Sequence, residues 1–277
     1  MPSPTKPHVL ITAGPTREPI DAVRDWGNIF SGETGLRLAL ACLGLGNVTL
    51  LTSNAAHAAD YDGYSGSNGM LGVETFRSHA DLHALLKERV TSGERVDAVA
   101  MTAAVADYTP AGAFRIVARR AEASSTDGVG REIWTVESID AAKIKSQHSE
   151  IAIVGRATGK LVDQFRSAWG YRGLLIKFKL EVGVEKDALL RIAEASRRES
   201  GADLMVANTL AMTGAASPAS SAGASSGEAG AYLLGGSERA GGSDAEGVGG
   251  ARWVPREALP AAVAEWIRAA LKMQPSA

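Results

Sequence analysis

The chain has 277 residues, with 29 Lys and Arg against 31 Asp and Glu, and a formal net charge of -2. This near-neutral balance excludes a protein coated with positive charge for nucleic acid, and the single cysteine, Cys42, excludes a disulfide framework or a thiolate zinc cluster. No stretch reaches the ~20 apolar residues of a membrane span, and Met1–Lys6 does not begin a signal peptide. We therefore expect a cytoplasmic protein with neither nucleic acid nor membrane as a partner.

The N-terminal part predicts strands and helices in alternation. His8–Thr12 is an apolar run that ends in a glycine turn, as expected of a buried strand. Gly35–Leu45 carries apolar residues at helical spacing, and Val48–Leu51 is a second apolar run. A strand, helix and strand in this order require a right-handed parallel crossover. The long loop between Gly14 and Gly32 indicates a functional segment rather than a simple connection.

The same pattern returns further along the chain. Strands are expected at Asp97–Thr102, Gly173–Phe178 and Asp203–Asn208, and helices after a capping box at Ser78–Asp81, over Lys186–Ser200 and over Arg256–Met273. We predict one α/β domain over residues 1–277, with a doubly wound, mostly parallel Rossmann-like sheet.

Two segments depart from this pattern. Phe114–Val117 and Glu132–Val136 alternate apolar and polar residues, so we expect residues 111–165 to form a projecting antiparallel ribbon that makes a dimer contact. Residues 214–250 are rich in Gly, Ala and Ser, which predicts a flexible loop. Tyr232–Leu234 and Arg252–Val254 flank part of this loop and are expected to pair as an edge hairpin.

The first candidate site segment, GPTREPIDAVRDWGNIFSGETG, follows the first predicted strand. Ligands of open parallel sheets bind at the carboxyl ends of their strands. Gly32 and Gly35 precede a helix, where backbone N–H groups can approach an anion. Arg17 and Arg24 offer charged hydrogen bonds to phosphate, and Asn28 offers an amide to a developing oxyanion. The alternative is a structural loop with glycine turns and solvated arginines.

Three shorter segments offer further ligand chemistry. In AAVADYTP, small residues let a planar ligand lie against the backbone. Asp107 can accept a hydrogen bond from a base or sugar; the alternative is that it caps the end of a strand. Lys143 and Lys145 could neutralise a triphosphate, although two surface lysines are more often simply solvated. Phe178 could stack on a base, and core packing is the alternative for it. The helical pair His79 and His83 has no visible third zinc ligand.

Other enzyme classes lack their sequence signals. No G-x-G-x-x-G follows the first predicted strand, and no Tyr is followed four residues later by Lys. An NADP-linked Rossmann reductase therefore remains only an alternative. The chain also has no Walker A sequence and no G-x-S-x-G elbow.

Taken in order, the segments ITAGPTREPIDAVR…N…SG…G, AAVADYTP, KIKS, FKLE and GADLMVANTL resemble the phosphopantothenate–cysteine ligase family. The resemblance runs from about residue 8 to 210. It implies that the carboxylate of 4′-phosphopantothenate attacks the α-phosphate of CTP or ATP, with Mg²⁺ present, to give an acyl-nucleotidylate and pyrophosphate. The amine of cysteine then forms the amide. It also implies a homodimer joined through the ribbon, so that partner-chain residues complete each site.

The resemblance also assigns roles by motif position. The catalytic residues are Asn28, Lys143 and Lys145. The nucleotide-binding residues are Gly14, Thr16, Arg17, Ser31, Gly32, Ala103, Ala104, Asp107, Lys160 and Phe178. The substrate-binding residues are Arg24, Asn28 and Asn208. The ligands of the metal remain open.

The chain departs from the family pattern at several places, two of which bear on the assigned site residues. Phe30 stands where many members have serine, and residues 111–142 separate the Asp-Tyr motif from Lys143 by more than the family leads us to expect. The longer spacing leaves Arg115, Arg119 and Arg120 as alternatives to Lys143 for the catalytic cation. A non-catalytic nucleotide-binding relative of the ligase is therefore a third hypothesis.

Overall fold

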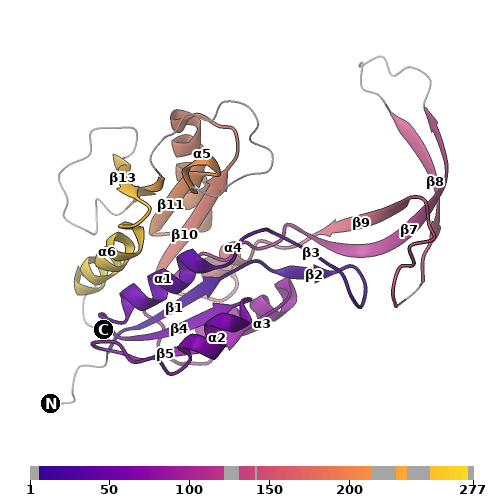
Figure 1. Cartoon of the computed structure of the whole chain (residues 1–277). Helices are drawn as coiled ribbons and strands as arrows, with labels where there is room; N and C mark the ends of the chain where they lie inside the picture. Colours follow the sequence, from indigo (N-terminus) through magenta and orange to yellow (C-terminus); the bar gives the residue numbers. More distant parts are fainter. Residues whose placement is uncertain (1–5, 122–130, 141, 214–228, 236–249, 274–277) are drawn as a thin grey trace.

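A computed structural model describes residues 6–121, 131–140, 142–213, 229–235 and 250–273. The main body is an eight-stranded sheet with helices on both faces (Figure 1). Its strands are β1 (His8–Ala13), β4 (Asn47–Thr52), β5 (Leu71–Thr75), β6 (Ala98–Met101), β10 (Leu174–Glu181), β11 (Leu204–Thr209), β12 (Gly230–Leu234) and β13 (Arg252–Pro255).

The strands follow the order β13-β12-β11-β10-β6-β1-β4-β5. The six from β11 to β5 are parallel, and β12 and β13 form the predicted antiparallel hairpin at one edge. The chain order reverses between the neighbours β1 and β6. Such a switch point opens a crevice at the carboxyl ends of the strands. The predicted doubly wound, mostly parallel α/β class is confirmed.

The six helices of the described residues cover the sheet in two layers. They are α1 (Glu33–Cys42), α2 (Ala55–Tyr61), α3 (His79–Thr91), α4 (Leu161–Ser167), α5 (Lys186–Ser200) and α6 (Leu259–Met273). α1 and α6 pack on one face around buried Leu38 and Ile267. α3 and α4 cover the other face around Leu86 and Phe165, and α5 packs against β11 through Leu189. Ser78 and Asp81 form the predicted capping box of α3. None of these helices combines the length and apolar character needed to cross a membrane.

The structure contains elements that the sequence patterns did not predict. The expected loop between Gly14 and Gly32 holds a small hairpin of β2 (Arg17–Pro19) and β3 (Asp25–Gly27). α2 and β5 occupy a stretch for which no element was expected. Each is short, with three to seven residues, so none carries enough periods for a helix or strand pattern to stand out.

A three-stranded antiparallel ribbon projects away from the main sheet (Figure 1). It consists of β7 (Tyr108–Ala121), β8 (Glu132–Ser138) and β9 (Ile151–Ala157), with β7 in the middle. This confirms the predicted ribbon, while residues 161–165 of the predicted insertion 111–165 belong to α4. Most of the predicted flexible loop 214–250 lies outside the described residues.

Candidate functional site

A cavity of about 700 Å³ lies at the carboxyl ends of the strands, beside the switch point. It receives residues from the segment before α1, the ends of β6 and β10, and the segment after β9. The predicted site residues in its wall are Gly14, Asn28, Ser31, Gly32, Ala103, Ala104, Asp107, Lys160, Phe178 and Asn208. Segments more than 150 positions apart in the sequence thus share one cavity.

The glycine turn brings the backbone close to the sheet. Gly32 has φ 85° and stands at the N-cap of α1, where no side chain caps the helix. A Cβ at Gly32 would lie 2.7 Å from the Gly14 backbone nitrogen, so only glycine fits this approach. The uncapped N–H groups at the start of α1 border the cavity, as the phosphate interpretation requires.

Asn28 is exposed in the cavity wall and is anchored at one end. Its Nδ2 donates to the Ala104 carbonyl at 3.2 Å, and the backbone N–H of Thr16 donates to the same carbonyl at 3.2 Å. The amide oxygen of Asn28 has no partner among the described residues. The side chain can therefore offer that oxygen, and the second hydrogen of Nδ2, to a ligand.

Thr16 and Arg17 lie outside the cavity wall. Thr16 is fully buried, and its hydroxyl accepts from the Ala106 N–H at 2.8 Å. Arg17 is exposed and its guanidinium lies 3.4 Å from Asp25. Within this chain, Thr16 therefore holds the Ala104–Ala106 part of the wall through hydrogen bonds. Arg17 forms an ion pair with Asp25 inside the β2–β3 hairpin.

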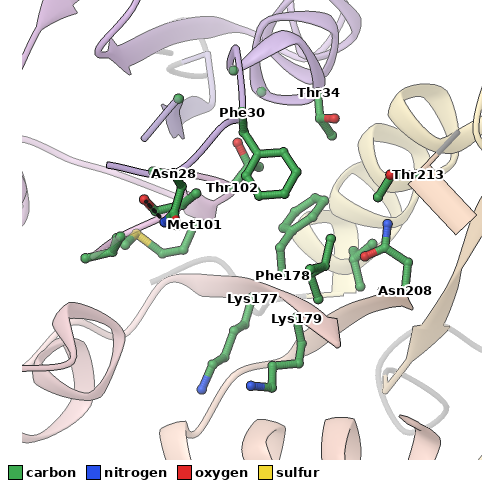
Figure 2. A pocket seen from close by; sticks show the side chains of 18 of the residues that line it. Asn28, Phe30, Thr34, Met101, Thr102, Lys177, Phe178, Lys179, Asn208 and Thr213 are labelled. Atoms are coloured by element: carbon green, nitrogen blue, oxygen red, sulfur yellow. Dashed lines mark hydrogen bonds between the residues drawn. The ribbon is translucent and has the colours of Figure 1, made fainter. Parts of the chain in front are cut away.

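The two faces of β10 contribute different chemistry. Phe178 is half-buried and packs partly against the core beneath α1 and α6, yet it also lines the cavity with Phe30 (Figure 2). Lys177 and Lys179 leave the strand on the opposite face. Lys177 Nζ donates to the Ser196 carbonyl at 3.3 Å, and burial lowers the pKa of this lysine.

Arg24 lies outside this cavity and holds a different segment. Its Nε and Nη2 donate to the Asp21 carboxylate at 3.0 and 2.5 Å, and Nη2 also donates to the Ile144 carbonyl at 2.6 Å. The Ile144 N–H donates back to Asp21 at 3.0 Å. The Asp21 side chain is 1% exposed, and the Arg24 guanidinium holds the pKa of Asp21 well below its usual range. Asp21 and Arg24 therefore clamp the segment around Ile144 to the β2–β3 hairpin.

The clamp determines where Lys143 and Lys145 lie. Both are exposed on either side of buried Ile144, and they line a second pocket of about 560 Å³ together with Arg24. Three residues separate Arg24 from Asn28, and the described wall of the cavity that contains Asn28 includes neither lysine. A single chain therefore does not bring these lysines into the cavity that contains Asn28.

Several residues of the cavity wall were not predicted. Thr102, Thr158, Lys177, Lys179 and Arg256 belong to this group. The alternation of Lys177 and Lys179 around Phe178 could have indicated two of them, whereas no sequence signal connects Arg256 with the motif segments.

Among the residues that the structure describes, the wall contains two carboxylates, Glu33 and Asp107. No group of three or more His, Cys, Asp or Glu within the described ranges could hold a metal ion. His79 and His83 instead contact the Gly159 carbonyl at 2.7 Å and the Gln164 side chain at 3.0 Å.

Comparisons with curated proteins, solved structures and a family model agree with one another. The coenzyme A biosynthesis bifunctional protein CoaBC of Bacillus subtilis is 39% identical over 108 residues, which are 39% of this chain and 24% of that protein. The chain spans less than half the length of the curated relatives it matches.

Solved structures show the same fold. The DNA/pantothenate metabolism flavoprotein of Streptococcus pneumoniae has a TM-score of 0.64 at 22% identity, covering 95% of this chain and 98% of that one. A Cab2 mutant in complex with phosphopantothenate-cysteine has a TM-score of 0.55 at 15% identity, covering 96% and 88%.

One family model matches the N-terminal part of the chain. Residues 5–126 match the model of the DNA/pantothenate metabolism flavoprotein C-terminal domain. These residues include the glycine turn, Asn28 and the Ala103–Asp107 segment. The resemblance predicted from the sequence is thus confirmed: over residues 5–126 this chain is similar to the DNA/pantothenate metabolism flavoprotein C-terminal domain.

Proposed function

We propose that the cavity is the active site of a cytoplasmic phosphopantothenate–cysteine ligase that uses CTP or ATP together with Mg²⁺. The observation that carries this proposal is the meeting of Asn28, Ala103–Asp107, Phe178 and Asn208 in one cavity. The match to a pantothenate-metabolism domain supports it, as do the names of relatives in coenzyme A biosynthesis.

In the first proposed step, a carboxylate oxygen of 4′-phosphopantothenate attacks the α-phosphorus of the triphosphate. The bond from that phosphorus to the pyrophosphate oxygen breaks, and pyrophosphate leaves. Backbone N–H groups at Gly32 and the start of α1 suit the phosphate oxygens, and Asn28 holds the mixed anhydride. Glu33 and Asp107 are oxygen donors of the kind that Mg²⁺ prefers, and the bound ion would neutralise charge on the triphosphate.

In the second proposed step, the amine of cysteine attacks the acyl carbon of the anhydride. The bond from this carbon to the nucleotide oxygen breaks, the nucleoside monophosphate leaves, and the new amide nitrogen loses a proton. Phe178 provides a ring on which the base can stack, and Asp107 can accept a hydrogen bond from the sugar. Asn208 contributes an amide at the substrate side of the cavity.

We also propose that the protein is a homodimer in which Lys143 and Lys145 of one subunit complete the cavity of the other. Their exposure, and their place in a pocket separate from the one that Asn28 lines, support a shared site. The ribbon offers a surface for the contact, because its exposed apolar side chains include Val117, Trp134, Val136 and Val154.

The function is tested by measuring pyrophosphate release from purified protein with phosphopantothenate, cysteine, Mg²⁺ and each of the four nucleoside triphosphates in turn. Release with CTP or ATP that depends on phosphopantothenate is the expected result. Tight nucleotide binding without release would instead identify a non-catalytic relative. The Asn28→Ala variant should keep the fold and lose most of the activity.

Mixing two inactive variants tests the shared site. Asn28→Ala and Lys143→Ala, unfolded together and refolded, form mixed dimers that each contain one intact composite site. Because half of the dimers are mixed, about a quarter of the wild-type activity should return. If Lys143→Ala is inactive alone and no activity returns on mixing, the lysine acts within its own subunit. If Lys143→Ala is fully active, it is not the catalytic cation.

A further inference from the structure

A buried polar cluster lies behind the glycine turn, and no motif segment includes it. It consists of Thr52 at the end of β4, Asn54 at the N-cap of α2, and His57 in the first turns of that helix. His57 is only 5% exposed. Its Nδ1 lies 2.9 Å from the Thr52 hydroxyl, and its Nε2 lies 3.2 Å from Asn54 Nδ2.

The contacts of Asn54 determine which ring nitrogen of His57 carries the proton. Asn54 Oδ1 accepts from the Ala56 N–H at 3.1 Å, which identifies the amide oxygen. Asn54 Nδ2 donates to the Ser31 carbonyl at 3.2 Å, and its second hydrogen faces His57. An amide nitrogen donates and does not accept. His57 Nε2 must therefore be the acceptor, and Nδ1–H donates to Thr52.

These bonds form a continuous connection from the buried ring to the cavity. Ser31 and Gly32 both line the cavity at the start of α1. The Ser31 carbonyl is bonded to Asn54, and Asn54 is bonded to His57. The orientation of the turn thus depends on the acceptor at Nε2.

We propose that His57 is a positioning residue: in its neutral form it orients Asn54, and Asn54 holds the Ser31–Gly32 turn in the arrangement that binds the phosphates of the nucleotide. The identity of this ligand rests on the proposed function, whereas the connection from His57 to Ser31 does not. His57 touches no reacting atom.

The proposal predicts a dependence on pH. Protonation would place an N–H at Nε2 against the N–H of Asn54, and the bond between them would be lost. Burial lowers the pKa of His57 from 6.5, while the carboxylates of Glu33 on α1 and Asp60 on α2 act in the opposite direction. Thr52 and Asn54, which contact the ring directly, are uncharged. The turn therefore stays tethered at neutral pH and is released on the acid side of 6.5.

Two substitutions separate the positioning role from simple support of the fold. His57→Gln places an oxygen acceptor near the position of Nε2 but cannot take up a proton. His57→Leu removes the acceptor. For pyrophosphate release between about pH 5 and 8, the wild-type KM for nucleotide should rise in acid, and the Gln variant should abolish that rise. The Leu variant should raise KM about three- to tenfold at every pH, with a smaller change in kcat.

His83→Gln is the matched control, because this histidine lies on α3 and contacts Gln164. It should keep the wild-type pH profile. If His57→Gln retains the acid rise in KM, or if His57→Leu has a wild-type KM throughout, the positioning role is overturned.

An NMR titration tests the connection independently of turnover. The His57 ring should carry its proton on Nδ1 and titrate below 6.5. The amide signals of Ser31 and Gly32 should follow that titration in the wild type and not in His57→Gln. A ring protonated on Nε2 at neutral pH, or turn signals that ignore its titration, would overturn the proposal even in an active ligase. The expected titration in a protein that releases no pyrophosphate would instead count against the ligase function alone.

Discussion

Replacing Gly32 with alanine tests the backbone contact on which the cavity is built. The new Cβ would lie 2.7 and 3.0 Å from the backbone nitrogen and Cα of Gly14, and 3.2 Å from the carbonyl carbon of Ala13. All three atoms belong to the backbone at the end of β1, so no side chain can rotate away. Gly32 also has φ +85°, which an L side chain rarely adopts.

The expected loss of stability has two parts. The left-handed conformation costs alanine about 1 kcal/mol, and crowding against a fixed backbone adds about 1–3 kcal/mol. We therefore expect Gly32→Ala to lower the free energy of unfolding by about 2–4 kcal/mol. Denaturant unfolding with an unchanged m-value is the appropriate measurement.

Two further glycines separate these contributions. Gly93 has φ +89° with nothing within 4 Å of an added Cβ, so Gly93→Ala reports the conformational strain alone. Gly72 has no positive φ and equally open space, so its alanine variant should lose nothing. If Gly32→Ala costs no more than Gly93→Ala, the close approach of the turn to β1 is not present in solution.

Three further predictions concern other parts of the chain. Burial raises the pKa of the Cys42 thiol to about 12, so a thiol reagent at neutral pH should label it only as fast as the protein unfolds, and rapid labelling would contradict its place in the core. Asp21→Asn should weaken the clamp, so trypsin should cleave several-fold faster after Lys143 and Lys145, on either side of Ile144, while its other sites are unaffected. An unchanged cleavage rate would show that the clamp does not hold the segment. Because the pKa of Asp21 is lowered, its stabilisation is present above the ordinary Asp pKa and is lost as the pH falls below it. Val136→Asp on the exposed ribbon should lower the apparent mass in size-exclusion chromatography, and an unchanged dimer would place the contact elsewhere.

The main sheet was predictable because its strands are buried on both faces. Such strands appear as continuous apolar runs, and His8–Thr12 and Asp97–Thr102 both matched the structure closely. The meeting of the motif segments was predictable for a related reason, since the carboxyl ends of parallel strands share one edge. The hairpin at Arg17–Pro19 and Asp25–Gly27 was missed because three residues show no period.

Residue type alone did not predict which groups the charged residues contact in the structure. The resemblance assigned Arg24 to the substrate by motif position, and a guanidinium suits phosphate; in the structure its Nε and Nη2 groups donate to Asp21 and the Ile144 carbonyl. The separation of 120 positions between Arg24 and Ile144 left no local pattern to detect. His57 was missed for a different reason: its role depends on which hydrogen-bond partners surround it, and the sequence does not specify them.

The charge of the cavity bears on whether one subunit alone can bind the proposed nucleotide and phosphorylated acid. A nucleoside triphosphate and a phosphorylated acid carry several negative charges, and Glu33 and Asp107 add two more to the wall. Of the lysines in that wall, Lys179 lies 3.0 Å from Glu181, Lys177 is half-buried with a lowered pKa, and Lys160 is exposed. Exposed Lys160 and Arg256 thus give one subunit some positive charge for its proposed ligands, while two more exposed lysines stand in a separate pocket of the same chain. A second copy that brings those lysines to the cavity would add to this positive charge around the triphosphate.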